Sequence, residues 1–177
     1  MISDEQDELP AVPEGDRGIV SAWLREELGR PLTVVVVTPT ASGWHESEFR
    51  SELDQTESVK YTVAQLDAAQ RGDQSVAVFA RFANLTPDIL LAWCDQQPAD
   101  SDWLRSVVRA ADQVGLSDQC FMAVAGTAVE KGLARSLGFD NCFSPEEPFD
   151  EVFRTIAREG VTREVFRRRG ASPPCYL

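Results

Sequence analysis

The sequence predicts an α/β fold, a three-layer sandwich in which helices cover both faces of a parallel sheet. Two short runs are apolar almost throughout, Leu32–Thr38 and Cys120–Ala125, a pattern typical of strands buried on both faces. Segments with apolar residues at helical spacing separate such runs. With 177 residues, 43% of them hydrophobic, the chain is long enough for one domain with its own core. Strands that alternate with helices indicate a parallel sheet.

Five strands are expected, and right-handed connections between them fit the flavodoxin-like (Rossmann-like) strand order 2-1-3-4-5. The third strand is placed at Ser75–Ala80 because this run is nearly all apolar. The expected strands cover residues 32–38, 59–63, 75–80, 120–125 and 139–143.

Helices are predicted between these strands from apolar spacing and from residues that typically begin or end a helix. The pair Thr127 and Glu130 forms a capping-box pattern that starts one helix, and Pro148 opens another that Gly160 stops. The other expected helices are one from Ile19 that Gly29 ends, a short polar one at 46–53, one that Pro87 opens and that contains Ile89–Trp93, and one from Ser101 or Asp102 to Gly115.

The two ends of the chain differ in composition from the predicted domain, which covers residues 17–160. Residues 1–16 carry six acidic side chains, no basic one and two prolines, which predicts a disordered acidic leader. Residues 161–177 are expected to form a basic C-terminal extension. An aromatic group at Phe82, Trp93 and Trp103 flanks polar stretches, and we expect it to be buried against a partner.

The composition excludes several classes of function. A formal net charge of −12 argues against a nucleic-acid or anionic-membrane surface, and no apolar run approaches the roughly 20 residues of a membrane span. Four cysteines without a C-x-x-C pair predict reduced thiols and a cytoplasmic location. No phosphate-binding loop or nucleophile-elbow motif appears.

Ligands of open parallel sheets bind beyond the carboxyl ends of the strands. The predicted strands place four loops there: 39–45, 81–86, 126–127 and 144–147. The first contains His45, the only histidine of the chain. The third contains Gly126, where a missing side chain allows close approach to the backbone.

The stretch from Gly115 to Pro145 resembles the closing strand–helix–strand of vitamin B12 (cobalamin)-binding domains, as in lysine/ornithine aminomutases and methionine-synthase-like corrinoid proteins. Its matching motifs are Ala125-Gly126, Leu137-Gly138-Phe139-Asp140 and Phe143-Ser144-Pro145. The family signature Asp-x-His-x-x-Gly has its counterpart in residues 43–48. There the histidine is kept as His45, while Gly43 replaces the aspartate and Glu48 replaces the glycine.

This resemblance implies a cobalamin-binding-like module, degenerate in its signature, that binds cobalamin or no cofactor. It implies that His45 is the cobalt ligand and that a cofactor groove includes Ser42, Gly43, Ala125, Gly126, Thr127 and Ser144. It also implies a binding or regulatory role with a partner protein or in a homo-oligomer. We expect no catalysis by the chain on its own.

A receiver domain of the response-regulator type is the alternative, because Thr127, Leu137–Asp140 and Pro148-Phe149-Asp150 are similar to receiver motifs. Thr38-Pro39 stands where receivers carry the acidic pair that binds Mg²⁺. Phosphoryl transfer to an aspartate needs those carboxylates. The alternative is therefore a pseudo-receiver that binds proteins and lacks the phosphoacceptor aspartate.

Overall fold

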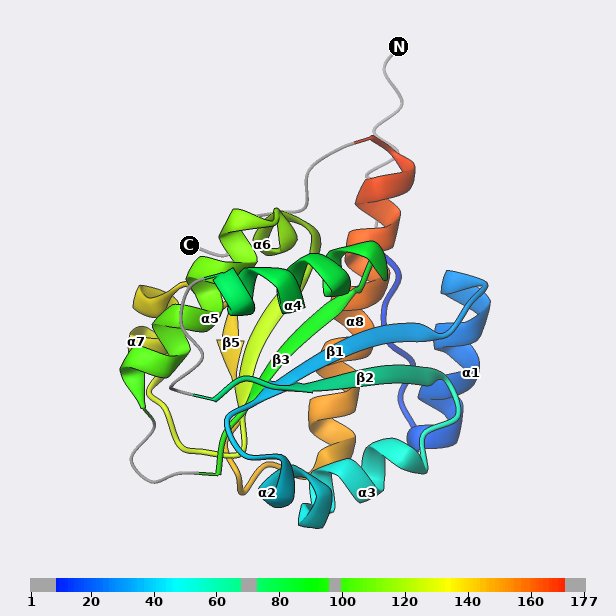
Figure 1. Ribbon diagram of the computed structural model, residues 1–177. Coiled ribbons are helices and arrows are strands. Elements are labelled where there is room, and N and C mark those ends of the chain that lie inside the picture. Colours follow the sequence, from blue (N-terminus) through cyan, green and yellow to red (C-terminus); the bar gives the residue numbers. More distant parts are fainter. Residues whose placement is uncertain (1–8, 68–72, 96–99, 171–177) are drawn as a thin grey trace.

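The computed structural model describes residues 9–67, 73–95 and 100–170, and it has five parallel strands in the order β2-β1-β3-β4-β5 (Figure 1). The predicted fold class and strand order are confirmed. The strands are β1 (Leu32–Thr38), β2 (Val59–Gln65), β3 (Ile89–Trp93), β4 (Phe121–Ala125) and β5 (Asn141–Cys142).

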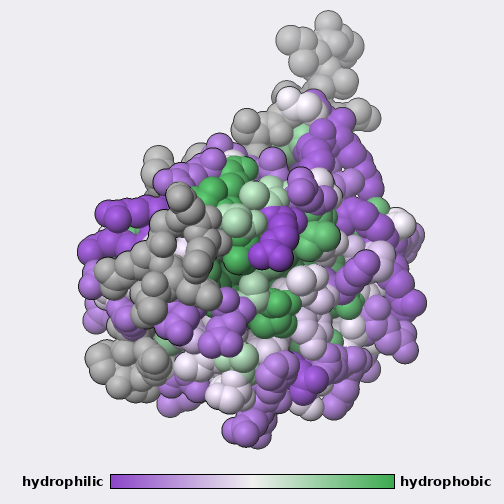
Figure 2. Space-filling view, viewed as in Figure 1, coloured by the Kyte–Doolittle hydropathy of each residue, from purple (hydrophilic) through white to green (hydrophobic). Residues whose placement is uncertain are grey.

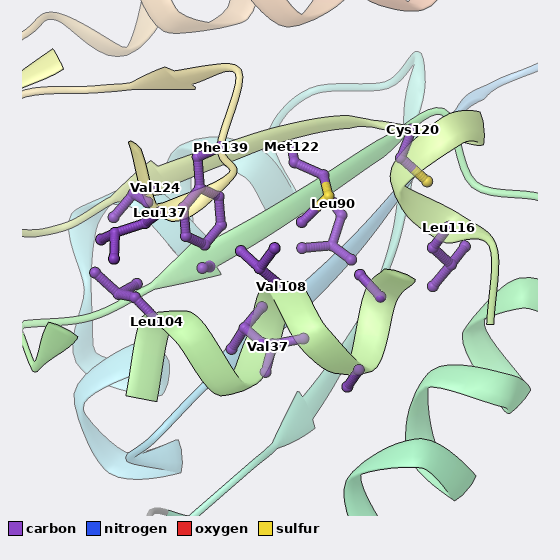
Figure 3. Close-up of a cluster of buried hydrophobic side chains, with 14 of the residues drawn as sticks. Val37, Leu90, Leu104, Val108, Leu116, Cys120, Met122, Val124, Leu137 and Phe139 are labelled. Atoms are coloured by element: carbon purple, nitrogen blue, oxygen red, sulfur yellow. The ribbon is translucent and has the colours of Figure 1, made fainter. Parts of the chain in front are cut away.

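Helices cover both faces of the sheet and produce two separate apolar cores. One core lies between the sheet and α4, α5, α6 and α7, with side chains such as Leu104, Val108 and Leu116 facing Leu90 and Met122 (Figure 3). The other lies between the sheet and α1, α2, α3 and α8. The helices are α1 (Arg17–Leu28), α2 (Ala41–Glu46), α3 (Glu48–Asp54), α4 (Asp73–Asn84), α5 (Ser101–Gln113), α6 (Leu116–Gln119), α7 (Lys131–Leu137) and α8 (Phe149–Arg168).

Between residues 75 and 93 the predicted helix and the predicted strand were wrong, because each segment has the other kind of secondary structure. Ser75–Ala80 belongs to helix α4, and Ile89–Trp93 is strand β3 rather than part of a helix. Both runs are apolar almost throughout, so periodicity cannot tell a buried strand from a buried helix. The position in the sheet decides between them. All five residues of β3 are buried between β1 and β4, which suits a strand covered on both faces.

Two helix boundaries also differ from the prediction. Helix α7 begins at Lys131, four residues after the predicted Thr127. Helix α8 does not stop at Gly160 but continues to Arg168. A Cβ atom at Gly160 would collide with the Leu32 side chain, so this glycine allows α8 to approach β1. Residues 161–168 therefore belong to the domain and are not an extension, and residues 171–177 lie outside the described part.

The described part of the acidic leader makes ordered contacts, contrary to the prediction for residues 1–16. Asp16 caps α1 by accepting from the Ile19 amide at 3.1 Å, and Arg154 donates to the Pro13 carbonyl at 2.7 Å. Val12 packs against the core that contains α1 and α8. Residues 1–8 lie outside the described residues.

The expected aromatic partner surface is also wrong. Phe82, Trp93 and Trp103 are only 3%, 5% and 3% exposed, because they pack into the two cores of their own chain. Among the described residues, no helix combines the length and the apolar character needed to cross a membrane.

Candidate functional site

The carboxyl ends of the strands meet at one edge of the sheet, where β1 and β3 lie side by side and their connections leave in opposite directions. Such a switch point is the usual ligand position in this class of fold. In this protein α2 and α3 follow β1, and the first turn of α8 follows β5. These elements, together with the ends of β3 and β4, form the candidate site.

His45 lies in the last turn of α2 rather than in the expected loop, and its side chain is exposed. Its backbone carbonyl accepts from Arg50 at 3.2 Å. The neighbouring Trp44 points inward and is 1% exposed. Within the described residues, no group of three or more histidine, cysteine or acidic side chains could hold a metal ion.

Gly43 lies against Asp95, which follows β3. A Cβ atom at Gly43 would collide with the Asp95 carboxylate, and the Thr40 hydroxyl lies 3.4 Å from the other Asp95 oxygen. Asp95 was missed as a site residue because β3 was placed too early in the chain. Ser42 is exposed on the same short helix.

An aromatic cluster fills the space beneath α2 and α3. The Trp44 ring contacts Trp93, Tyr61 and Phe49 at centroid distances of 5.6, 6.0 and 6.1 Å. Phe49 in turn lies 5.3 Å from Phe149 of α8. These rings pack edge to face or tilted, an arrangement that stabilises aromatic pairs, and they join three helices to the sheet.

Gly126 ends β4 with φ of +88°, a conformation that L side chains rarely adopt. A Cβ atom there would lie 2.6 Å from the Cys94 carbonyl oxygen and 2.9 Å from Trp93 Nε1. The missing side chain therefore makes room for the chain's own tryptophan. The sequence predicted that a ligand approaches the backbone at Gly126. In the structure it is the Trp93 side chain that lies there.

A cavity of about 280 Å³ remains beside Gly126, and we call it the β4–β5 cavity. It brings together Ala125, Gly126 and Ser144 of the predicted site, whereas His45, Ser42, Gly43 and Thr127 do not line it. Thr127 is fully buried. The remaining lining residues are Ser47, Glu48, Phe49, Trp93, Phe143, Pro145, Glu147 and Val152.

The walls of this cavity are apolar and its rim is acidic. Trp93, Phe143 and Val152 are buried, whereas Glu48 and Glu147 are exposed at the opening. None of the lining residues is basic. The chemistry of the cavity suits a slender group that is apolar along its length and neutral or positive at its end.

In the described residues the geometry argues against a receiver that accepts a phosphoryl group, and it does not bear on the pseudo-receiver alternative, which lacks the phosphoacceptor aspartate. Strand β1 is followed by Pro39 and Thr40, and the acidic residue after β3 is Asp95, two positions beyond the strand end. Across the described ranges no three acidic side chains converge on a cation site. The carboxylate set needed for phosphoryl transfer is therefore missing there.

No family model matches the chain, and no curated protein matches it. Solved structures do match. A cobalamin-binding protein from Desulfitobacterium hafniense DCB-2 superposes with a TM-score of 0.49 at 14% identity, over 86% of this chain and 68% of that one. The monomethylamine corrinoid protein of Methanosarcina barkeri gives 0.51 at 10% identity, over 80% of this chain and 64% of that one. A protein of Burkholderia thailandensis assigned to pilus assembly (CpaE) gives 0.44 at 13% identity, over 71% of this chain and 98% of that one.

The fold is flavodoxin-like and cobalamin-binding-like. At such low identity the likeness shows the fold alone, and the chain spans about two thirds of the length of the first two structures.

The structure does not bring the residues that the resemblance names for histidine-ligated cobalamin into one cavity. His45 is exposed on α2 away from the lining of the β4–β5 cavity, and the space directly beside Gly126 is taken by Trp93.

Proposed function

We propose that this chain is a non-catalytic protein-binding module on a cobalamin-binding-like fold, and that the β4–β5 cavity receives an arginine side chain of a partner protein. The observation that supports this most directly is the combination of apolar walls with Glu48 and Glu147 at the opening. An arginine buries an apolar stem while its guanidinium stays at the surface.

The charge balance favours the same kind of partner. The chain has a net charge of −12, so a basic protein is attracted before contact and an acidic one is repelled. The planar guanidinium can also stack on an aromatic ring such as Phe49 while it pairs with a carboxylate.

The test uses NMR shifts of the Gly126 and Ser144 amides during titration with the probe peptide acetyl-Gly-Arg-Gly-amide. We expect both amides to shift, and the glutamate-containing counterpart of the peptide to leave them unchanged. The double variant Glu48→Gln, Glu147→Gln should abolish the response because it removes both rim charges. Glu146→Gln is the matched control, since the neighbouring Glu146 is exposed but does not line the cavity.

The same preparation is titrated with hydroxocobalamin. We expect its visible spectrum to stay unchanged, in the wild type and in His45→Ala alike. A spectral change that requires His45 would overturn the proposal in favour of a cofactor site. Unshifted amides with the arginine peptide would also overturn it.

A further inference from the structure

Strand β2 forms one edge of the sheet, and no other strand in the described part of the chain pairs with its outer side. In the space-filling view, apolar residues gather over and beside α4, with hydrophilic residues around and among them (Figure 2). Ala77 and Ala80 of α4 are exposed, and Val63 of β2 is half-buried. An unpaired sheet edge is a typical site of strand addition.

Within the described residues, the outer side of β2 has backbone hydrogen-bonding groups without a partner, except that the Val59 amide donates to the Thr56 carbonyl at 3.4 Å. At one end of the pairing with β1, the Leu32 amide donates to the Ser58 carbonyl; at the other end, the Leu66 amide donates to the Thr38 carbonyl, both at 2.8 Å. Even-numbered residues of the strand therefore bond to β1. Because neighbouring residues alternate in direction, the N–H and C=O groups of the odd-numbered residues point outward, among them those of Tyr61 and Val63.

Apart from Lys60, the described residues give this strand none of the devices that usually protect such an edge. Its seven residues pair with β1 in continuous register without a bulge, and the sequence Val-Lys-Tyr-Thr-Val-Ala-Gln contains no proline and one charge, Lys60. Natural edge strands are usually shortened, bulged, charged or covered. This edge is regular and nearly neutral, although the whole chain has a net charge of −12.

We propose that β2 pairs with β2 of a second copy of this chain, antiparallel about a two-fold axis at Thr62. This register overlaps the whole strand and brings outward-facing residues opposite each other, as antiparallel hydrogen bonding requires. Tyr61 then faces the partner's Val63, an aromatic–β-branched pair that stabilises sheets. Thr62 faces itself, and Lys60 faces the partner's Ala64. No like charges meet, so the strand is complementary to itself, as a two-fold interface demands.

The helix beside the edge is compatible with this pairing. Ala64 packs into the core that α4 covers, so Lys60 and Thr62 point to the same side of the sheet as α4. A two-fold axis perpendicular to the sheet keeps the two α4 helices on one side. The exposed Ala77 and Ala80 then allow these helices to approach each other across the axis, which adds contact area to the strand pairing.

This interface is independent of the proposed function, because the β4–β5 cavity lies at the carboxyl end of other strands. The two properties also respond differently to salt. Two copies with the same net charge repel each other, and salt screens that repulsion. Self-association should therefore strengthen with added salt, whereas binding of a basic peptide should weaken.

The test is sedimentation velocity of the full chain over a concentration series under reducing conditions. We expect a concentration-dependent shift from the 19.6 kDa monomer to a species of twice that mass. Thr62→Lys and Thr62→Glu, each alone, should weaken association by at least about tenfold, because like charges then meet at the axis. An equimolar mixture of the two should restore it. Thr62→Val is the matched control and should associate like the wild type.

Hydrogen exchange gives a second measurement that needs no variant. The Tyr61, Val63 and Gln65 amides should become more protected as protein concentration rises, while those of Thr62 and Ala64 are protected throughout. A wild-type chain that stays monomeric at every concentration and salt level overturns the proposal. So does a dimer that persists in Thr62→Lys, or a mixture of the charged variants that does not associate.

Discussion

Two glycines of the chain differ in whether the structure leaves room for a side chain. Gly126 has φ of +88° and no room for a side chain, whereas at Gly132 of α7 an added Cβ atom would meet nothing within 4 Å. We expect Gly126→Ala to lower the free energy of unfolding by about 2–4 kcal/mol through backbone strain and overpacking. Gly132→Ala should raise it by about 0.5 kcal/mol through helix propensity. Urea unfolding measures both, and a neutral Gly126→Ala would contradict the close packing of Trp93.

A buried thiol links stability to pH. Cys120 is 1% exposed and donates to the Pro87 carbonyl at 3.3 Å, and burial, with a smaller effect of Asp88, raises the pKa of its thiol to about 12 from 9.0. The folded state therefore keeps a proton that the unfolded state releases above pH 9. The thiol's contribution to stability is complete below that pH and is lost as pH rises toward 12.

We expect the free energy of unfolding to fall between pH 9 and pH 12, and the fall to be shallower in Cys120→Ala, because that variant lacks the thiol whose pKa is raised to about 12. Urea unfolding at a series of pH values measures the slope, and the variant provides the background from other groups. Equal slopes in the two proteins would show that this thiol does not carry the dependence.

At the scale of elements, one ionic cluster joins three segments near the amino ends of the strands. Arg30, between α1 and β1, donates to both Asp88 oxygens at 2.7 and 2.8 Å and to Glu164 of α8 at 3.2 Å. Asp88 is fully buried and also accepts from the Thr33 amide at 2.9 Å. The pKa of Arg30 is raised, mainly because its guanidinium donates hydrogen bonds to Asp88. The cluster fixes how α8 and β3 sit against β1.

Asp88→Ala should lower the free energy of unfolding by about 3–5 kcal/mol, because it leaves a half-buried guanidinium and a backbone amide without their partner. Arg25→Ala is the control. Its ion pair with Glu57 is 3.8 Å long and exposed on both sides, and such pairs contribute little. Thermal or urea unfolding compares the two, and similar losses would mean that burial of Asp88 does not matter.

For the whole molecule, the two ends of the sheet have different roles. The Arg30 cluster at the amino ends uses a basic residue to hold helices and strands together. The carboxyl ends carry the aromatic cluster and the β4–β5 cavity, with exposed glutamates at its opening. The exposed carboxylates of Glu48 and Glu147 therefore lie beside the opening of the β4–β5 cavity. This arrangement is the basis of the proposed preference for a basic partner.

The order of the strands was predictable although two elements were assigned the wrong type. Reversing helix and strand between residues 75 and 93 left five strands separated by helices, and right-handed connections then allow few arrangements. Ala125, Gly126 and Ser144 line one cavity, because residues that follow neighbouring parallel strands must meet at one edge. Local sequence determines such groupings whenever it marks the strand ends.

Contacts between distant segments decided the rest. Periodicity could not distinguish α4 from β3, since both are apolar runs, and only the place of β3 between β1 and β4 made it a strand. Gly160 looks like a helix stop along the chain, but its contact with Leu32 shows that it serves the packing of α8. His45 matches a cofactor motif in sequence, yet helix α2 turns it to solvent, because the buried Trp44 beside it takes the inward position in the core.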